Sequence, residues 1–168
     1  MILRELAESD EAAFLQAVKE YEGALDWLTF LWRPGTLFPE HVERLRKNKR
    51  GEDLPPGRVP DSMLYAFVEG AIVGRVNIRH ELNEYLSERG GHIGYSVAPR
   101  YRRRGYASEI FRLCLPFCRA AGLTRILITC DDDNAGSWKI LEAAGAQLEG
   151  KRLDRQTGKD YRRYWLNA

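Results

Sequence analysis

The sequence predicts a mixed α/β fold, in which a central sheet of about six to seven strands is flanked by about four helices. Two observations predict this fold. Short β-branched or apolar runs of strand length alternate with longer segments whose apolar residues recur every three or four positions. Residues 92–130 also have the order strand, helix, strand, which predicts parallel pairing or a close variant of it.

Length and composition indicate one domain over residues 1–168 and exclude a disordered chain, because 44% of the residues are hydrophobic and the net charge is only +2. Three cysteines are a sparse and odd set, which does not suggest a disulfide framework. The first residues lack a signal-peptide pattern, and no apolar stretch approaches the ~20 residues of a membrane span. We therefore expect a cytoplasmic protein without a membrane partner.

The first sixty residues predict one short strand and two helices. Ile2–Leu6 has strand character, and Asp10 is placed to cap a helix that carries Phe14. Pro39 opens a second helical pattern that continues through Leu45. Four aromatic residues between these helices could line an acceptor pocket, although packing of the helices onto the sheet is the favoured interpretation: Trp27, Phe30, Trp32 and Phe38.

The second helix ends in a basic run, Arg44–Arg50, in which five of seven residues are Arg or Lys. This run could contact nucleic acid or an acidic substrate, but a solvated helix end is the favoured interpretation, so nucleic acid is not the expected partner. Gly51–Pro60 contains three prolines and predicts a loop.

The middle of the chain predicts three strands. Leu64–Val68 and Ile72–Ile78 are strand-like runs separated by Glu69-Gly70-Ala71, which predicts a hairpin. A polar interval from His80 to Gly91 follows. His92–Val97 then alternates, with His92, Gly94 and Ser96 predicted on one face of the strand.

An apolar-periodic helix is predicted from about Tyr106 to Ala121, ended by Gly122. Pro116 lies inside this pattern and predicts a kink or local irregularity. Cys114 and Cys118 are four residues apart and could share a metal, but they lie on the apolar stripe of the helix, which favours core packing.

The last forty residues predict strand, helix, strand, strand, with these bounds: Arg125–Cys130, Ala135–Ala144, Gln147–Leu153 and Tyr161–Leu166. The three carboxylates of Asp131–Asp133 could bind a divalent cation, but the sequence lacks the glycine and the glutamate that a calcium-binding loop has at fixed positions. We interpret these residues as a charged strand end and expect no metal site.

The main candidate for a ligand-binding site is the turn before the long helix. Four of the five residues in Arg100–Arg104 are arginine, and Gly105 follows directly. A helix N-terminus presents free N–H groups and partial positive charge, which suit a phosphate. A solvated basic turn with a capping glycine explains the same pattern equally well. No Gly-Lys-Ser/Thr follows, so a nucleotide-triphosphate loop is excluded.

Arg102-x-x-Gly105-x-Ala107 resembles the pyrophosphate-binding signature of the GCN5-related N-acetyltransferases (GNAT), and Val97-Ala98-Pro99 resembles the end of that family's fourth strand. Asn134-x-x-Ser137 with the following Ile140-Leu141-Glu142 and Gly145 resembles its second motif. The resemblance implies that residues 63–168 form an acetyl-CoA-binding core and residues 1–60 a substrate-facing helical part. The implied acetyl-CoA-binding residues are Val97, Arg102, Arg103, Arg104, Gly105, Tyr106, Ala107, Ser108 and Asn134.

A narrower likeness supports the same assignment over the C-terminal two thirds of the chain. Three segments look like a predicted-acetyltransferase branch of the family: Arg79-His80-x-Leu82-Asn83, Gly90 to Tyr95 and Arg163-Tyr164-Trp165. The resemblance implies direct transfer of an acetyl group to a primary amine on a small molecule or a peptide, while a homodimer stays open. The alternative is a non-catalytic acetyl-CoA-binding or regulatory module.

Acetyl transfer to an amine needs a base, a polarised thioester carbonyl and an acid that protonates the leaving thiolate. Backbone N–H near Val97 could hold the thioester oxygen. The carboxylate that many family members carry near the start of the fourth strand is absent, so His92 is the expected base, with His80 and Glu81 in reserve. The usual tyrosine of the following helix is Leu141 here.

Ser137 is therefore the expected acid, with capping of the helix N-terminus as its alternative role. Asn134 could bind the pantetheine arm or cap the same helix.

Overall fold

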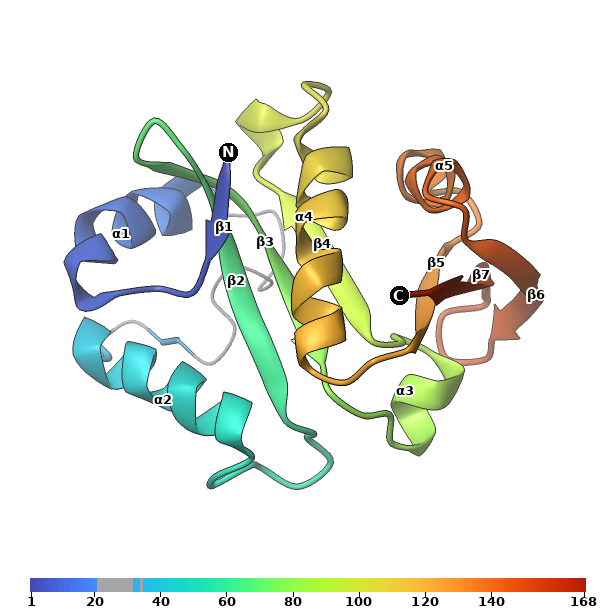
Figure 1. Ribbon diagram of the computed structural model, residues 1–168, viewed down its shortest axis with the longest axis horizontal. Helices are drawn as coiled ribbons and strands as arrows, with labels where there is room; N and C mark the ends of the chain where they lie inside the picture. Colours follow the sequence, from blue (N-terminus) through green and yellow to red (C-terminus); the bar gives the residue numbers. More distant parts are fainter. Residues whose placement is uncertain (21–31, 34) are drawn as a thin grey trace.

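A computed structural model describes residues 1–20, 32–33 and 35–168, so Trp27 and Phe30 lie outside the described residues. Within them, seven strands form two sheets (Figure 1). The first sheet is antiparallel in the order β1-β2-β3-β4, with β1 at Ile2–Arg4, β2 at Asp61–Val68, β3 at Ala71–Arg79 and β4 at Ile93–Val97. The second has the order β5-β7-β6, with β5 at Arg125–Asp131, β6 at Gln147–Asp154 and β7 at Lys159–Asn167.

The described part of the chain has five α-helices: α1 Glu11–Glu20, α2 Phe38–Arg50, α3 Glu84–Glu88, α4 Tyr106–Ala120 and α5 Ala135–Ala143. The predicted α/β class is confirmed, and the additional helix is α3, inside the interval predicted only as polar. Asn83 begins α3, because its side chain accepts a hydrogen bond from the Leu86 N–H at 2.9 Å.

Helices cover both faces of the first sheet. Tyr65 of β2 packs edge-on against Phe14 of α1, with ring centroids 6.0 Å apart. Gly74 of β3 pairs with Ala66 of β2. Ala66 follows Tyr65 directly, so these two positions belong to the opposite face of the sheet from Tyr65. On that face Gly74 lies close to Ile110 of α4. Figure 1 shows α1 and α2 beside β1 and β2, α4 in front of β4, and α5 beside the second sheet. As a result, β2 and β3 are buried along nearly their whole length.

The predicted hairpin between β2 and β3 is confirmed. Val68 pairs with Ala71 across the turn. Glu69 and Gly70 have φ angles of 50° and 80°, as in the two-residue turn whose twist matches that of paired strands. The glycine permits one of these positive φ values without strain.

Contrary to the prediction of one continuous sheet, β4 and β5 separate after a short contact. An isolated bridge joins Gly91 to Ile128, and the His92 N–H donates to the Leu127 carbonyl at 2.7 Å. We call these backbone contacts the β4–β5 pin. Beyond the pin no further pairing joins the two described strands, and a cleft opens between them.

One local prediction needs correction. Asp10 does not cap α1; its carboxylate accepts the Ala7 N–H at 2.7 Å and pairs with Arg4 at 2.6 Å, which stabilises the turn before the helix instead. Pro116 lies inside α4, as the sequence pattern places it, and the helix continues to Ala120.

The basic run at the end of α2 is largely paired with carboxylates. Lys47 bonds Asp53 at 3.0 Å, Lys49 bonds Glu5 at 2.6 Å, and Arg50 bonds both Glu43 and Glu52. Cys114 and Cys118 are both free and fully buried in the core. No helix in the described ranges is long and apolar enough to cross a membrane.

Candidate active site

The cleft between the diverging strands opens beside the N-terminus of α4 as a hollow of about 680 Å³, which we call the α4 hollow. Eight of the nine residues predicted to bind acetyl-CoA line it: Val97, Arg102, Arg103, Gly105, Tyr106, Ala107, Ser108 and Asn134. The ninth, Arg104, is not in its lining, and its guanidinium lies 5.9 Å from the centre of the Tyr101 ring. The two sequence motifs therefore meet at one surface.

The turn before α4 is shaped for an anion. Gly105 begins the helix with a φ of 80°, and no side chain caps the helix N-terminus, so the first backbone N–H groups stay available. A β-carbon at Gly105 would meet no atom within 4 Å, which leaves room for a ligand against the backbone. Arg103 also has a positive φ, 63°, a strained conformation at the ligand-facing turn.

Positive charge remains at this turn. Arg100 pairs with Glu20 at 2.7 Å, whereas Arg102, Arg103 and Arg104 form no ion pair with the carboxylates of the described residues. Arg102 also donates from Nε to the Val97 carbonyl at 3.1 Å, which ties the turn to the end of β4. Free helix N–H groups and unpaired arginines together suit a pyrophosphate.

A second hollow, of about 430 Å³, lies beside α3, and we call it the α3 hollow. Its lining combines residues of α3 and the following loop with the facing edges of β4 and β5. The two hollows share four residues, namely Tyr95, Ser96, Asn134 and Ser137. A molecule in one hollow therefore meets a molecule in the other at these side chains.

Tyr95 and Ser137 form the polar contact at this junction, with the phenol oxygen 2.9 Å from the serine Oγ. The Tyr95 ring packs against Phe111 of α4 at 5.8 Å between centroids. Burial raises the pKa of Tyr95 to about 12, and its hydrogen bond to Ser137 only partly opposes this. Both hydroxyls are therefore protonated near neutral pH.

Asn134, not Ser137, caps α5. The Asn134 Oδ1 accepts the Ser137 N–H at 3.1 Å, so the capping role considered for the serine belongs to its neighbour. The Ser137 hydroxyl instead forms a hydrogen bond with the Tyr95 hydroxyl. This cap also fixes where the serine lies relative to β4.

His92 does not lie at this junction. It lines neither hollow, its side chain is buried, and its Nδ1 accepts the Leu127 N–H at 2.9 Å. Burial lowers its pKa. The ring thus completes the β4–β5 pin, and this placement does not support the expected role as base.

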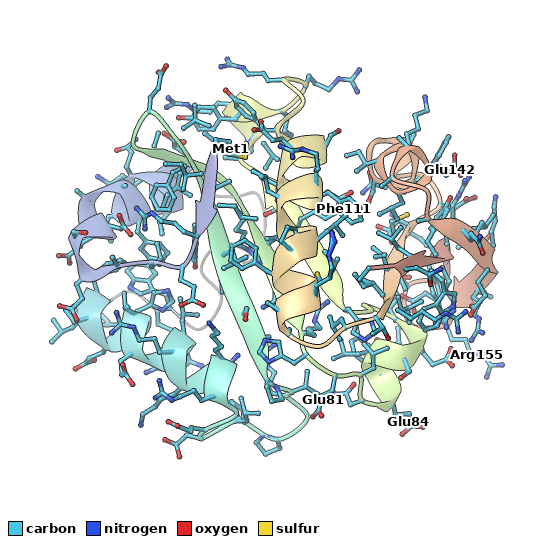
Figure 2. All side chains as sticks on the ribbon, in the orientation of Figure 1. Met1, Glu81, Glu84, Phe111, Glu142 and Arg155 are labelled. Carbon is cyan, nitrogen blue, oxygen red and sulfur yellow. The ribbon has the colours of Figure 1, made fainter. Side chains whose placement is uncertain are left out.

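The two reserve residues also lie away from the junction. His80 is 2.9 Å from the Ser62 hydroxyl and lines neither hollow. Glu81 is exposed at the rim of the molecule, before α3 (Figure 2).

Three residues that the sequence analysis did not assign to the active site line the α3 hollow: Tyr95, Arg79 and Asp131. Asp131 pairs with Arg89 at 2.5 Å. No group of three His, Cys, Asp or Glu side chains within the described ranges could hold a metal ion. The sequence signals for Tyr95 were its place in the Gly90 to Tyr95 segment and a hydroxyl-bearing side chain on the strand face opposite to that of His92.

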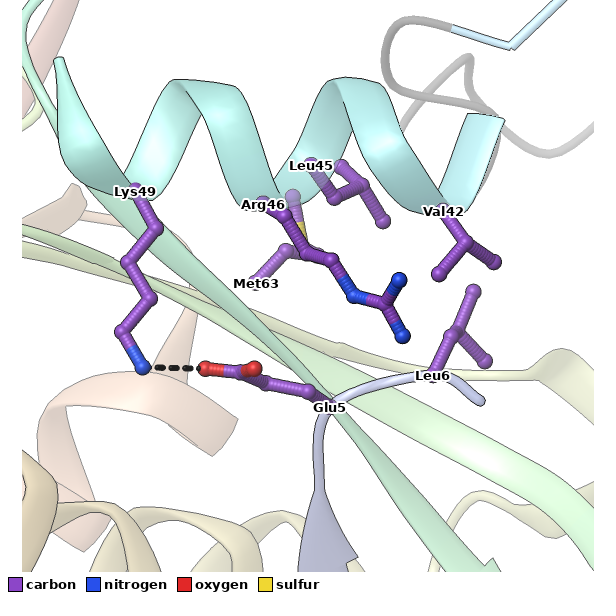
Figure 3. Close-up of a pocket in the computed structure, with 7 residues that line it drawn as sticks. All are labelled: Glu5, Leu6, Val42, Leu45, Arg46, Lys49 and Met63. Atoms are coloured by element: carbon purple, nitrogen blue, oxygen red, sulfur yellow. Dashed lines mark hydrogen bonds and ion pairs between the residues drawn. The ribbon is translucent and has the colours of Figure 1, made fainter. Parts of the chain in front are cut away.

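A further hollow between α2 and β1 is too small for a ligand. Its volume is about 10 Å³, room for one water at most. Leu6, Val42 and Met63 close it, and the Lys49–Glu5 ion pair lies at its rim (Figure 3).

Two splayed sheets, with the uncapped and basic start of α4 at the mouth of the cleft between them, match the architecture expected of an acetyltransferase. The family model described as "Acetyltransferase (GNAT) domain" matches residues 1–147. The chain belongs to this family.

Known proteins resemble the chain over most of its length. The uncharacterized N-acetyltransferase YnaD of Bacillus subtilis (strain 168) is 32% identical over 136 residues, which cover 80% of this chain and 74% of that protein. The ribosomal-protein-alanine N-acetyltransferase from Brucella melitensis superposes with a TM-score of 0.66 at 18% identity, over 100% of both chains. Mycobacterium smegmatis RimJ, in complex with CoA-disulfide, gives a TM-score of 0.68 at 22% identity, over 99% of this chain and 81% of that one. At these identities the two structures establish a shared fold.

Proposed function

We propose that the protein transfers an acetyl group from acetyl-CoA directly to a primary amine, with both substrates bound at once. The observation that carries the proposal is the pair of hollows that meet at Tyr95 and Ser137. One hollow has the features of a phosphate site, and the other has no uncapped helix N-terminus in its lining and is open to a second molecule.

The α4 hollow fits acetyl-CoA. Its volume of about 680 Å³ lies within the usual range for ligand sites, about 300–1,000 Å³. The uncapped N-terminus of α4 and the side chains of Arg102 and Arg103 would hold the pyrophosphate. The CoA-disulfide bound to the RimJ neighbour supports the same ligand class. Acetyl-CoA supplies the activated acyl group.

Ser137 and Tyr95 supply the proton that the leaving thiolate needs. Their hydroxyls share a hydrogen bond at the junction, so a proton given up by one is replaced from the other. The pKa of Tyr95, about 12, keeps the phenol protonated near neutral pH, and solvent returns the proton that the Tyr95–Ser137 pair gives to the thiolate. The sequence prediction of Ser137 as acid is kept in this scheme, with Tyr95 added.

A covalent acyl-enzyme is not part of the scheme. Cys130 is the thiol in the lining of the α3 hollow, and burial raises its pKa to about 11. The thiol is then almost wholly protonated near neutral pH and is a poor nucleophile. The amine itself is therefore the attacking group.

Asp131 is the carboxylate in the lining of the α3 hollow and is our proposed acceptor for the amine proton. Its side chain is partly exposed, so the proton passes from it to solvent. Asp131 thus replaces His92 in the role expected from the sequence.

Two measurements test the proposal. Calorimetry with acetyl-CoA should show binding, and thiol release across a panel of primary amines, read also by mass spectrometry, should show acetylated product. Ser137→Ala and Tyr95→Phe should each lower kcat roughly 10- to 100-fold while leaving acetyl-CoA affinity within about threefold. The absence of binding at hundreds of micromolar refutes the proposal. Binding without acetylation of any amine favours the non-catalytic module.

A further inference from the structure

The α3 hollow has an uneven distribution of charge. Its charged lining residues are Arg79, Arg89 and Asp131. Arg89 has two carboxylate partners, Asp131 at 2.5 Å and Asp154 at 3.4 Å. Arg79, by contrast, forms no ion pair within 4.0 Å with any described residue. One positive charge of the hollow thus has no carboxylate of the described residues within ion-pair distance.

The Arg79 side chain is held in place by the loop after α3. Its Nη1 donates to the Gly90 carbonyl at 3.2 Å and to the Gly91 carbonyl at 3.0 Å. Neither Nε nor Nη2 has a hydrogen-bond partner in the described part of the chain, and neither is sealed from solvent. The guanidinium therefore keeps N–H donors for a group inside the hollow, in the planar arrangement that suits a carboxylate.

Electrostatics support an anionic partner for Arg79. Burial lowers its pKa, and the nearby Asp61 offsets this only in part. Asp61 is itself buried and bonds the Asn77 side chain at 2.8 Å. A buried cation without a close counter-charge is costly, and an anion in the hollow would stabilise it.

We infer that the α3 hollow takes an acceptor amine that also carries a carboxylate, and that Arg79 binds this carboxylate. The inference rests on the proposed acetyl transfer, because it places the acceptor in the α3 hollow. The amine lies toward Asp131 and Ser137 and the carboxylate toward Arg79, so the charges of the hollow and of the acceptor are complementary. The volume of about 430 Å³ admits a small amino acid or the first residues of a peptide.

The test compares acceptors that differ only in charge. One pair is the peptides Ala-Asp-Gly-amide and Ala-Asn-Gly-amide; the other is 4-aminobutyrate and 4-aminobutanamide. In each pair the carboxamide keeps the shape and removes the charge. We expect kcat/KM to favour the carboxylate roughly 10- to 100-fold in at least one pair, since a hydrogen bond to a charged group contributes on that scale. A preference within the first pair identifies a peptide acceptor, and one within the second a small molecule.

Variants locate the preference. Arg79→Gln should abolish it and Arg79→Lys should retain part of it. Arg58→Gln is the matched control, because it removes one positive charge near Asp61 from a residue that does not line the hollow. It should leave the preference unchanged.

Equal turnover of both members of both pairs, or a preference that persists in Arg79→Gln, overturns the inference while the proposed transfer stands. Acetylation of no amine at all, with acetyl-CoA bound, refutes the proposed function and the inference with it. The wild-type comparison decides the question even where an Arg79 variant does not fold.

Discussion

Replacing Gly91 by alanine tests the β4–β5 pin. A β-carbon at this position would lie 2.3 Å from the Leu127 carbonyl oxygen and 3.2 Å from the Ile128 Cα, and these backbone atoms cannot move aside alone. The φ of 63° adds the strain of a left-handed non-glycine residue, roughly 1–2 kcal/mol. Overpacking adds roughly 1–3 kcal/mol, so we expect a loss of about 2–5 kcal/mol in the free energy of unfolding.

For a chain of 168 residues the unfolding entropy is about 0.35 kcal/mol/K, so this loss lowers Tm by roughly 6–14 °C. Differential scanning calorimetry measures the change. Gly122→Ala is the matched control, because Gly122 has a φ of 80° and a β-carbon there would meet nothing within 4 Å. It should lose only the backbone part, roughly 3–6 °C.

The contrast between the two variants isolates the steric clash. If Gly91→Ala lowers Tm no more than Gly122→Ala, the close approach of β4 and β5 is wrong. Acetyl-CoA affinity provides a second readout, since a displaced β4 alters the wall of both hollows. We expect that affinity to fall in Gly91→Ala and to be unchanged in Gly122→Ala.

Three more predictions follow from the site and its supports. Gly105→Val should weaken acetyl-CoA binding at least tenfold in calorimetry, because a β-branched residue strains the turn at a φ of 80°, while the circular dichroism spectrum stays that of the folded protein. His92→Ala should lower the free energy of unfolding by roughly 1–3 kcal/mol in urea titrations, since the buried Leu127 N–H loses its acceptor, and should keep kcat within about threefold; a stable variant without turnover would restore His92 as the base. Glu149 has its pKa lowered to about 2, chiefly by its hydrogen bond to Arg163, so its stabilising contribution is full above its unfolded pKa of about 4.5 and disappears as the pH falls through about 2. Glu149→Gln should therefore have a lower Tm than the wild type at pH 7 and an equal Tm near pH 2, and a constant difference across this range contradicts the assignment.

The elements predicted correctly from the sequence are those whose signals are local. Glu69 and Gly70 define a two-residue turn between two apolar runs, and Gly105 defines the start of α4; each depends on a few neighbouring residues. The prediction that the residues of this turn and Asn134 form one site depends on the same local signals, and most of these residues line the α4 hollow. The short helix α3 was missed because five residues are too few to show a helical period, although Asn83 is a recognisable cap.

The rest of the site depends on contacts between distant segments. Alternation along the strand correctly placed His92 and Tyr95 on opposite faces. However, the N–H group that donates to the His92 ring belongs to Leu127, which is 35 positions further along the chain. The Tyr95–Ser137 contact likewise spans 42 positions. The divergence of β4 from β5 is also a property of the packed molecule. For this reason the sequence pattern indicated Ser137, which lies at the junction of the two hollows, but assigned the base to His92, whose ring accepts a backbone hydrogen bond between the two sheets.

Each sheet is made from one continuous stretch of chain, residues 2–97 for the first and 125–167 for the second. During synthesis the ribosome therefore releases every strand of the first sheet before any strand of the second, and early pairing needs no later segment. The cleft, however, has one wall from each sheet, so it exists only after the second sheet has docked. Under the proposed function, acetyl-CoA binding would therefore report on the completion of folding, and the coenzyme would stabilise the docked state over any intermediate that has only the first sheet.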